Sequence, residues 1–396
     1  MNIIHKGIAV LLGSAVTGEK RKLPDGFTLE AAMPLIKKQS LETLVFQGAL
    51  NCGIPETDPT MMVLMQKYIL HLLKSEKQML AIGQLLAEFE RNGIDYLPLK
   101  GCNMKALYPK PELRVMGDAD ILIRFDQYER IEPIMSDLGF TLSCILSYTH
   151  EWDRSDLHVE LHRYLIAADD RQFHQYFADA WNRAVREIGH RYRLSPEDVF
   201  LFQFVHMTNH YQHSGIGSRH ILDLYVFLMK NPDLDHAYLE AELEKLHLLT
   251  FYRNMLAVLK AWFEDAPAND ITEYITDYIF SGGSWGTMEN GFQADALRKS
   301  RKEEGISAGR RKALVQMIFP PAKEMELNYP ILQKEHWLLP VVWVYRWFVV
   351  LLRRPERIRN RISVAVNTSD EKVLERQNGL RYVGLDPWQD GDGTRS

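Results

Sequence analysis

Cysteine is scarce in this sequence, and neither sign of charge is in large excess. The 396 residues include only Cys52, Cys102 and Cys144, an odd number without a Cys-x-x-Cys pair. This argues against a disulfide framework, so we expect a reducing compartment, the cytoplasm. The 47 Lys and Arg residues against 52 Asp and Glu residues give a net charge of −5. The whole-chain charge therefore does not favour wrapping of nucleic acid, and we expect no DNA partner.

A hydrophobic run long enough to cross a membrane is also missing. The most apolar stretch, Trp337 to Leu352, covers 16 residues and contains Pro340 and Arg346, whereas spanning a bilayer takes ~20 residues. The arginine-rich segment 353–361 follows it. Two interpretations remain open. One is a buried helix whose basic end complements its C-terminal dipole, and the other is a weak contact of 337–361 with an anionic membrane surface.

The apolar run near the N-terminus is short as well. It extends from Ile8 to Leu12 and is soon followed by the charged sequence Glu19-Lys20-Arg21-Lys22. A secretory signal needs a longer apolar stretch. We therefore predict a short amphipathic helix at this end.

The remaining composition is that of a globular protein. Apolar residues make up 46% and charged residues 25%, which excludes disordered and collagen-like classes. The length allows several substructures with cores of their own. Shifts in pattern along the chain predict a helical region at 1–92, a small α/β unit at 93–166, a helical domain at 167–352, and a basic segment with a weakly ordered tail at 353–396.

Strand-like and helix-like segments alternate within the small α/β unit. Turn-forming residues separate the segments, as at Asn92-Gly93 and Tyr108-Pro109. We expect strands at 94–99, 118–123, 140–148 and 157–161, and helices at 103–108 and 126–138.

Two aspartates at the start of the second expected strand are the sharpest local feature. Asp118 and Asp120 precede the apolar run Ile121-Leu122-Ile123. Residues two apart on a strand project from one face, ~6.6 Å apart along the chain. Two ionised carboxylates this close repel each other unless a cation lies between them, and hard oxygen ligands favour Mg²⁺ or Mn²⁺. The pair predicts a metal site, although Asp-x-Asp also occurs in solvated loops.

Two further groups of residues point to the same chemistry. Lys100-Gly101-Cys102 joins a strand end to a helix start, a turn whose N–H groups can approach phosphate, and Arg114 could add a bidentate phosphate contact. Glu160 and His162 are two apart on a later strand and so share a face, and the carboxylate of Glu160 would be the third that completes a two-metal site. Alternatively, Glu160 is a plain exposed strand residue and His162 a hydrogen-bonded core histidine.

These motifs together resemble a known family, the uncharacterised nucleotidyltransferases of the polymerase-β-like superfamily. The resemblance is strongest within residues 95–165 and is looser elsewhere between 40 and 350. It is carried by Leu99-Lys100-Gly101, Tyr108-Pro109, Leu113-Arg114-Val115-Met116-Gly117-Asp118-Ala119-Asp120-Ile121-Leu122-Ile123 and Val159-Glu160-Leu161-His162, and by Phe319-Pro320-Pro321, Asn328-Tyr329-Pro330 and Trp337-Leu338-Leu339-Pro340.

The resemblance implies an α+β fold, with a small mixed-sheet nucleotidyltransferase core flanked by N- and C-terminal helical regions. It also implies that three acids hold two Mg²⁺ (or Mn²⁺) ions and carry the catalysis, and that an NTP, with ATP expected, is the substrate. By position, the acids are Asp118, Asp120 and Glu160, and the nucleotide contacts are Lys100, Gly101, Cys102, Arg114 and His162. Cys102 stands where the superfamily often has serine, and a thiol is a poorer hydrogen-bond donor than a hydroxyl.

The helical domain is predicted to contact the acceptor of the transferred group. Its candidates are His206 and His210, four apart on one helix, with His220 and Asp223. A hydrogen-bonded structural cluster is the competing interpretation. The segment from His206 to His210 lacks the glutamate of the zinc-protease helix motif, which argues against zinc proteolysis.

The function expected from the sequence is Mg²⁺-dependent transfer of NMP from an NTP to an acceptor, with release of pyrophosphate. A small molecule or a protein hydroxyl is favoured over RNA as acceptor, because tight RNA binding requires many cations. Two alternatives stay open. The chain could be a non-catalytic nucleotide-binding protein that keeps the fold, or a peripheral membrane protein that uses 337–361.

Overall fold

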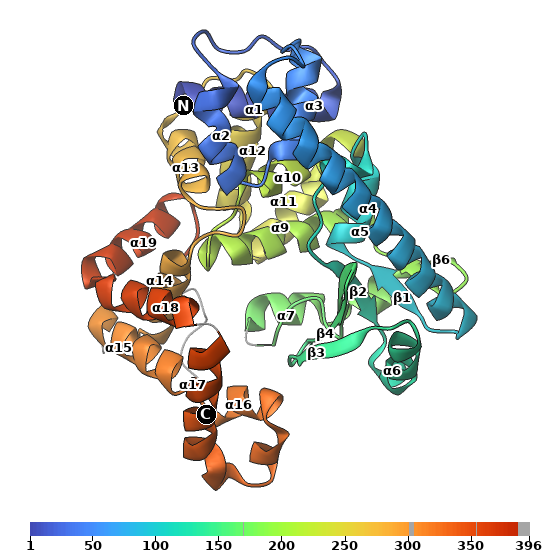
Figure 1. The fold of residues 1–396 in the computed structure, drawn as a ribbon, viewed down its shortest axis with the longest axis vertical. Helices are drawn as coiled ribbons and strands as arrows, with labels where there is room; N and C mark the ends of the chain where they lie inside the picture. Colours follow the sequence, from blue (N-terminus) through green and yellow to red (C-terminus); the bar gives the residue numbers. More distant parts are fainter. Residues whose placement is uncertain (169, 301–304, 354, 387–396) are drawn as a thin grey trace. The chain divides into compact units, whose positions relative to one another are not determined.

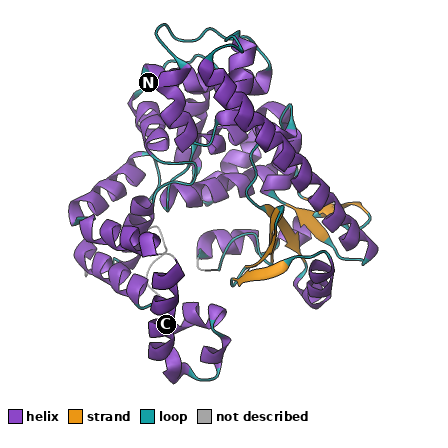
Figure 2. Cartoon of the chain, in the orientation of Figure 1, coloured by secondary structure: helices purple, strands orange, loops and turns teal. Residues whose placement is uncertain are grey.

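The structure of the protein is a computed structural model that describes residues 1–168, 170–300, 305–353 and 355–386 (Figures 1 and 2). It is mostly helical and contains a seven-stranded mixed sheet, so the predicted α+β fold with helical flanks is confirmed. The chain forms two compact units. The first comprises Met1–Met207 with Gly217–Ser284, and the second comprises Thr208–Ile216 with Trp285–Ser396.

The first unit begins with four helices, as the sequence predicts for residues 1–92. They are α1 (Ile3–Thr17), α2 (Leu29–Lys38), α3 (Glu42–Cys52) and α4 (Pro59–Arg91). The prediction of an amphipathic opening helix is wrong, because every residue of α1 from Gly7 to Val16 is buried. The short apolar run therefore belongs to the core of this unit. The Asp58 carboxylate begins α4 by accepting hydrogen bonds from the N–H groups of Thr60 and Met61.

The sheet lies within the first unit and combines parallel and antiparallel neighbours. Its order is β3-β4-β5-β2-β1-β7-β6, with β2 parallel to β5 and β1 parallel to β7. The strands are β1 (Tyr96–Pro98), β2 (Ala119–Ile123), β3 (Thr141–Ile145), β4 (Thr149–Arg154), β5 (Leu157–His162), β6 (Val185–Ile188) and β7 (Arg191–Arg193). Parallel pairing of β2 with β5 brings together two segments that are 40 residues apart in the sequence.

The strands β3, β4, β6 and β7 differ from the sequence prediction. The expected strand 140–148 is shorter, and β4 follows it as a separate strand after a turn. The β6–β7 hairpin lies where only helices were expected, and it turns at Gly189, whose φ is +53°. The hairpin is stabilised by pairing with β1, a long-range contact that local periodicity cannot reveal.

The two faces of the sheet differ in chemistry. Ala119, Ile121, Val159 and Leu161 point to one face and form a core with residues of α4 and of α6 (Tyr128–Asp137). Because side chains alternate along a strand, Asp120, Glu160 and His162 lie on the opposite face. Burial of the apolar set thus fixes which face carries the polar set.

Helices complete the first unit. α5 connects β1 to β2, and the remainder surround the sheet and the N-terminal helices (Figure 1). They are α5 (Lys100–Leu107), α7 (Arg171–Phe177), α8 (Ala180–Arg183), α9 (Pro196–Gln212, whose last residues belong to the second unit), α10 (Ser218–Lys230), α11 (His236–Lys245), α12 (Leu249–Phe263) and α13 (Asp270–Ser281).

The second unit is helical where it is described. It contains α14 (Met288–Lys299), α15 (Gly305–Ile318), α16 (Ala322–Asn328), α17 (Leu339–Arg353), α18 (Pro355–Asn367) and α19 (Asp370–Tyr382). The interpretation of α17 as a wholly buried helix is wrong, since Val344 and Phe348 on one face are 71% and 62% exposed. Among the described residues, no helix combines the length and the apolarity needed to cross a bilayer.

Candidate functional site

Register between β2 and β5 positions two acids side by side. In this parallel pair Asp120 is the register partner of Glu160, and Leu122 is the partner of His162. Register partners on adjacent strands share a face, so the two carboxylates and the imidazole are neighbours. Their strands are fixed from the other side by the apolar core that contains Ile121 and Leu161.

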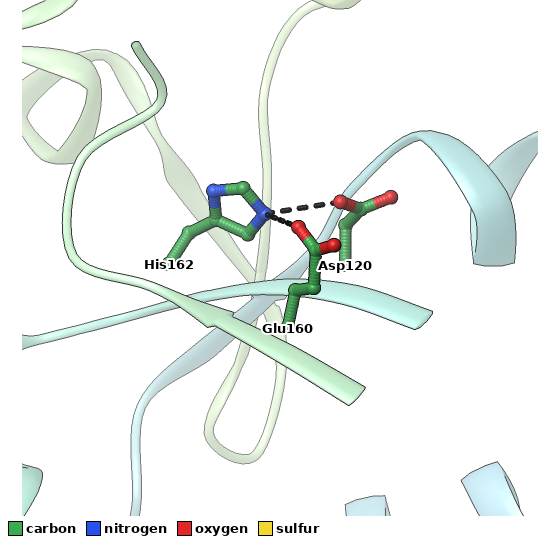
Figure 3. A group of neighbouring side chains, drawn as sticks. All are labelled: Asp120, Glu160 and His162. Carbon is green, nitrogen blue, oxygen red and sulfur yellow. Dashed lines mark hydrogen bonds and ion pairs between the residues drawn. The ribbon is translucent and has the colours of Figure 1, made fainter. Parts of the chain in front are cut away.

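Nε2 of the His162 imidazole points at both carboxylates (Figure 3). This nitrogen is 3.0 Å from Oδ1 of Asp120 and 3.4 Å from Oε2 of Glu160. One ligand atom from each of the three residues lies within 4.8 Å of the others. His162 is buried and hydrogen-bonded, as the alternative of a core histidine predicts, and its contact with a nucleotide remains a prediction.

Positive charges surround the carboxylate of Asp120, which is 5% exposed. Burial alone would raise its pKa, but Lys100 and His162 together hold the pKa well below the usual range. The Nζ of Lys100 is 3.6 Å from Oδ1 of Asp120 and lies over the ring of Phe202 in α9. Asp120 is consequently ionised at neutral pH and can bind a cation.

Asp118 stands immediately before β2, two residues from Asp120. Burial and the negative charges of Asp120 and Glu160 raise its pKa, against the opposing effect of Lys100. Asp118 is not one of the three residues whose ligand atoms lie within 4.8 Å of one another, but its charge interacts with the charges of Asp120 and Glu160. Such a group of carboxylates stores repulsion that a divalent cation would relieve.

Gly101 brings the start of α5 against this acidic group. A Cβ at this position would be 2.8 Å from the backbone oxygen of Asp118 and 3.1 Å from Sδ of Met116. The N–H of Leu99 donates to the backbone oxygen of Asp120, which continues the pairing of β1 with β2 up to the helix. The first turn of α5 therefore lies close to the carbonyl of Asp118, and phosphate binding by its N–H groups remains a prediction.

The thiol of Cys102 is partly buried against the core under the sheet. Burial, with the nearby charge of Asp120, raises the pKa of Cys102 to about 12. The thiol therefore stays protonated at neutral pH and does not act as a nucleophile there. Whether it contacts a nucleotide remains a prediction.

Arg114 is held by a residue that lies 109 positions away in the sequence. Its Nε and second guanidinium nitrogen donate to both oxygens of Asp223 in α10, at 3.0 and 2.9 Å. The hydroxyl of Tyr108 donates to the same carboxylate at 2.7 Å. Arg114 and Asp223 are only 15% and 19% exposed, so this buried ion pair ties the segment before Asp118 to α10.

A second anchor comes from α4, and no local sequence pattern predicts it. The buried Nζ of Lys105 donates to Oγ of Ser75 and to the backbone oxygen of Arg114, each at 2.9 Å. Gln78 donates to the backbone oxygen of Met116 at 3.2 Å. The segment that leads into Asp118 is therefore fixed from both α4 and α10.

The remaining histidines predicted to contact the acceptor stay predictions. His206 lies near Phe202 within the first unit, and His210 belongs to the second unit. The Nδ1–H of His220 donates a 3.3 Å hydrogen bond to the backbone oxygen of Gly217.

The donor set suits a divalent cation. Two carboxylates, those of Asp120 and Glu160, converge with the imidazole of His162, Asp120 is ionised, and Nδ1 of His162 is buried without a hydrogen-bond partner among the described residues. No curated protein and no solved structure matches this chain. A sequence model for one protein family matches residues 25–264, which is more than half of the chain and includes all these site residues. The chain therefore belongs to that family, the uncharacterised nucleotidyltransferases.

Proposed function

We propose that this protein transfers a nucleoside monophosphate from an NTP, most simply ATP, to an acceptor hydroxyl and releases pyrophosphate. One observation carries the proposal. The family's nucleotidyltransferase character coincides with acids on adjacent parallel strands, Asp120 and Glu160, next to Asp118 and to the N-terminus of α5. These are the parts that phosphoryl transfer requires: cation ligands and phosphate-binding N–H groups.

Each residue has a role that its position supports. Asp118, Asp120 and Glu160 would hold Mg²⁺ or Mn²⁺, and a bound cation neutralises charge on the transferred phosphoryl group. The acceptor oxygen forms a bond to the α-phosphorus, the bond from that phosphorus to the bridging oxygen breaks, and pyrophosphate leaves with the electron pair. Glu160 accepts the proton of the acceptor hydroxyl. Lys100 and the N–H groups at Gly101 bind phosphate oxygens.

We assign Arg114 a positioning role instead of a direct phosphate contact. Its guanidinium already makes a bidentate pair with Asp223. Binding phosphate would break a largely buried ion pair, which costs several kcal/mol when one charge is left alone. Arg114 instead fixes the segment from which Asp118 emerges.

We place the protein in the cytoplasm and expect a small molecule or a protein hydroxyl as acceptor. The three cysteines are free thiols, which is compatible with a reducing compartment. The net charge of −5 does not favour a large nucleic-acid substrate.

The test is turnover by the full chain with each NTP and Mg²⁺ or Mn²⁺, measured as pyrophosphate release across a broad acceptor screen. The double variant Asp118→Asn/Asp120→Asn should lose at least ~10³-fold, since the cation ligands are removed. The matched control is Asp126→Asn/Glu129→Gln, which removes two charges at η2 (Phe125–Gln127) and the start of α6 and should leave turnover unchanged.

Two outcomes would contradict the proposal. The first is NTP binding without turnover that depends on Asp118 and Asp120, which would favour a non-catalytic nucleotide-binding protein. The second is a crystal soaked with NTP and Mn²⁺ in which the anomalous signal of Mn²⁺ does not lie at Asp118, Asp120 and Glu160.

A membrane-surface contact remains a second candidate because of the exposed face of α17. Trp337, Val344 and Phe348 are each more than 60% exposed, and Arg359 and Arg361 of α18 are exposed as well. Apolar side chains next to arginines suit an anionic lipid surface. Flotation with vesicles that contain phosphatidylserine should depend on 337–361. Equal flotation of Val344→Ser/Phe348→Ser and of the unaltered chain would exclude this contact.

A further inference from the structure

The outward face of α4 is apolar although it is exposed. Met62, Ile69, Leu73 and Leu80 are 52%, 47%, 57% and 67% exposed. Spacings of seven, four and seven residues place them along one line of a straight helix, ~27 Å long. We call this line the outer stripe. Met65 and Leu70 lie beside it and are also exposed.

The inward face of the same helix is already occupied, so the stripe cannot turn into the core. Met61, Leu64 and Leu85 are buried. Tyr68 donates to Glu112 at 2.7 Å, and Gln78 donates to the backbone oxygen of Met116. These contacts fix the rotation of α4 about its axis, and the outer stripe needs a partner from outside this helix and its neighbours.

The pattern of the stripe is symmetric about position 71. In an antiparallel pairing with a second copy, Met62 would face Leu80, Ile69 would face Leu73, and each pair is equally distant from position 71. The polar positions match one another as well, because Gln66 would face Glu76. An isologous two-fold interface requires this self-complementarity.

We propose that two copies of this chain associate through the outer stripes of their α4 helices, antiparallel and centred on position 71. The polar positions agree with this arrangement, since the side-chain amide of Gln66 would face Glu76 of the second copy and can donate a hydrogen bond to its carboxylate. Antiparallel helices also align their dipoles favourably. A lipid surface is the weaker partner, because Glu76 would enter the apolar layer.

The association is independent of the proposed function, because it uses the face of α4 that points away from the catalytic segment. The inner face of α4 anchors that segment through Ser75 and Gln78. A second copy would therefore lie behind the candidate site without contributing a residue to it.

The test is sedimentation equilibrium of the full chain and of charge variants at the centre of the stripe. Ile69→Lys or Leu73→Glu alone should raise the dimer Kd at least ~100-fold, because each puts an unpaired charge against an apolar partner. The double variant Ile69→Lys/Leu73→Glu should regain dimerisation, since each lysine would then face a glutamate. A 1:1 mixture of the two single variants should dimerise for the same reason.

Both positions are exposed, so folding should be preserved, which the far-UV circular dichroism melting curve of each variant checks. Ile188→Lys, at a 72% exposed position in β6, is the matched control and should dimerise normally. A chain that stays monomeric at ~100 μM, a range in which specific dimers form, would overturn the proposal. Single variants that still dimerise would overturn it too. The proposal would also fail if the single variants are monomeric but neither the double variant nor the 1:1 mixture regains dimerisation.

Discussion

At the scale of single residues, the candidate site depends on groups that gain their properties from close neighbours. Gly101 is required by a close approach and not by its backbone angles, because a side chain there would meet the Asp118 carbonyl at 2.8 Å. Lys105 is 1% exposed, and its Nζ donates to Ser75 and to the backbone oxygen of Arg114. Each residue leads to a prediction.

Gly101→Ala should move the first turn of α5 away from Asp118. Backbone must shift to admit the new Cβ, so we expect a destabilisation of ~1–3 kcal/mol and at least a tenfold weaker NTP affinity. Gly83→Ala in α4 is the control, because nothing lies within 4 Å of its Cβ position and alanine gains ~1 kcal/mol in a helix. Urea unfolding and NTP titration measure both effects. An NTP affinity equal to that of the control variant would show that NTP binding does not need the close approach of Gly101 to Asp118.

Lys105 should make the stability of the protein rise with pH. Burial, with the charge of Arg114, lowers its pKa from 10.5 to about 8. Between pH 8 and 10.5 the unfolded chain therefore binds more protons than the folded chain, and the free energy of unfolding increases through this window. The full gain is about 3 kcal/mol, and it is absent below pH 8, where Lys105 is charged in both states.

Comparison with Lys105→Met isolates this effect from other groups that titrate at high pH. The difference in free energy of unfolding between the two proteins, measured by urea unfolding, should change by about 3 kcal/mol between pH 7 and pH 10.5. A pH-independent difference would mean that Lys105 keeps an ordinary pKa.

At the scale of elements, the segment between α5 and β2 is fixed by two helices distant in sequence. α4 contacts it through Ser75 and Gln78, and α10 contacts it through Asp223. The sequence marks Asp223 only as a possible acceptor contact. Its pairing with Arg114 becomes visible when α10 packs against α5, because no local pattern encodes a contact 109 residues apart.

Asp223→Asn should therefore damage the site from a distance. It leaves Arg114 charged and poorly paired in a largely buried position, which costs ~3–5 kcal/mol. We expect a lower kcat with little change in NTP affinity, because Arg114 positions Asp118 and does not bind phosphate. The variant Arg114→Met/Asp223→Leu should recover most of the stability. A rise in KM for NTP at constant kcat would instead assign Arg114 to phosphate binding.

At the scale of the whole molecule, we expect a cation bound by these acids to stabilise the folded protein. Asp118, Asp120 and Glu160 repel one another in the metal-free state, which part of the pKa shift of Asp118 reflects. A ligand that binds only the folded state at 100 times its Kd adds ~2.7 kcal/mol. Mn²⁺ or Mg²⁺ should therefore raise the Tm of the chain by a few degrees.

Asp118→Asn should be no less stable than the unaltered chain without a cation and should gain less stability from one. In the presence of a chelator its Tm should equal or exceed that of the unaltered chain, because a repulsive charge has gone, and added Mn²⁺ should raise it much less. Differential scanning fluorimetry against cation concentration measures both effects. Identical cation responses in the two proteins would place the cation elsewhere.

The sequence by itself determined the fold class and the family, and it predicted the acids of the candidate site. Asp118 and Asp120 stand next to an apolar run, and an alternating strand carries Glu160 and His162, so local periodicity was enough to place each on its own element. Only the tertiary structure decided that β2 and β5 are parallel neighbours and that Nε2 of His162 contacts the carboxylates of Asp120 and Glu160. It also decided that Arg114 forms an ion pair with Asp223. The physical reason is that pairing, burial and the resulting charges depend on contacts between segments 40 to more than 100 residues apart, which local pattern does not contain.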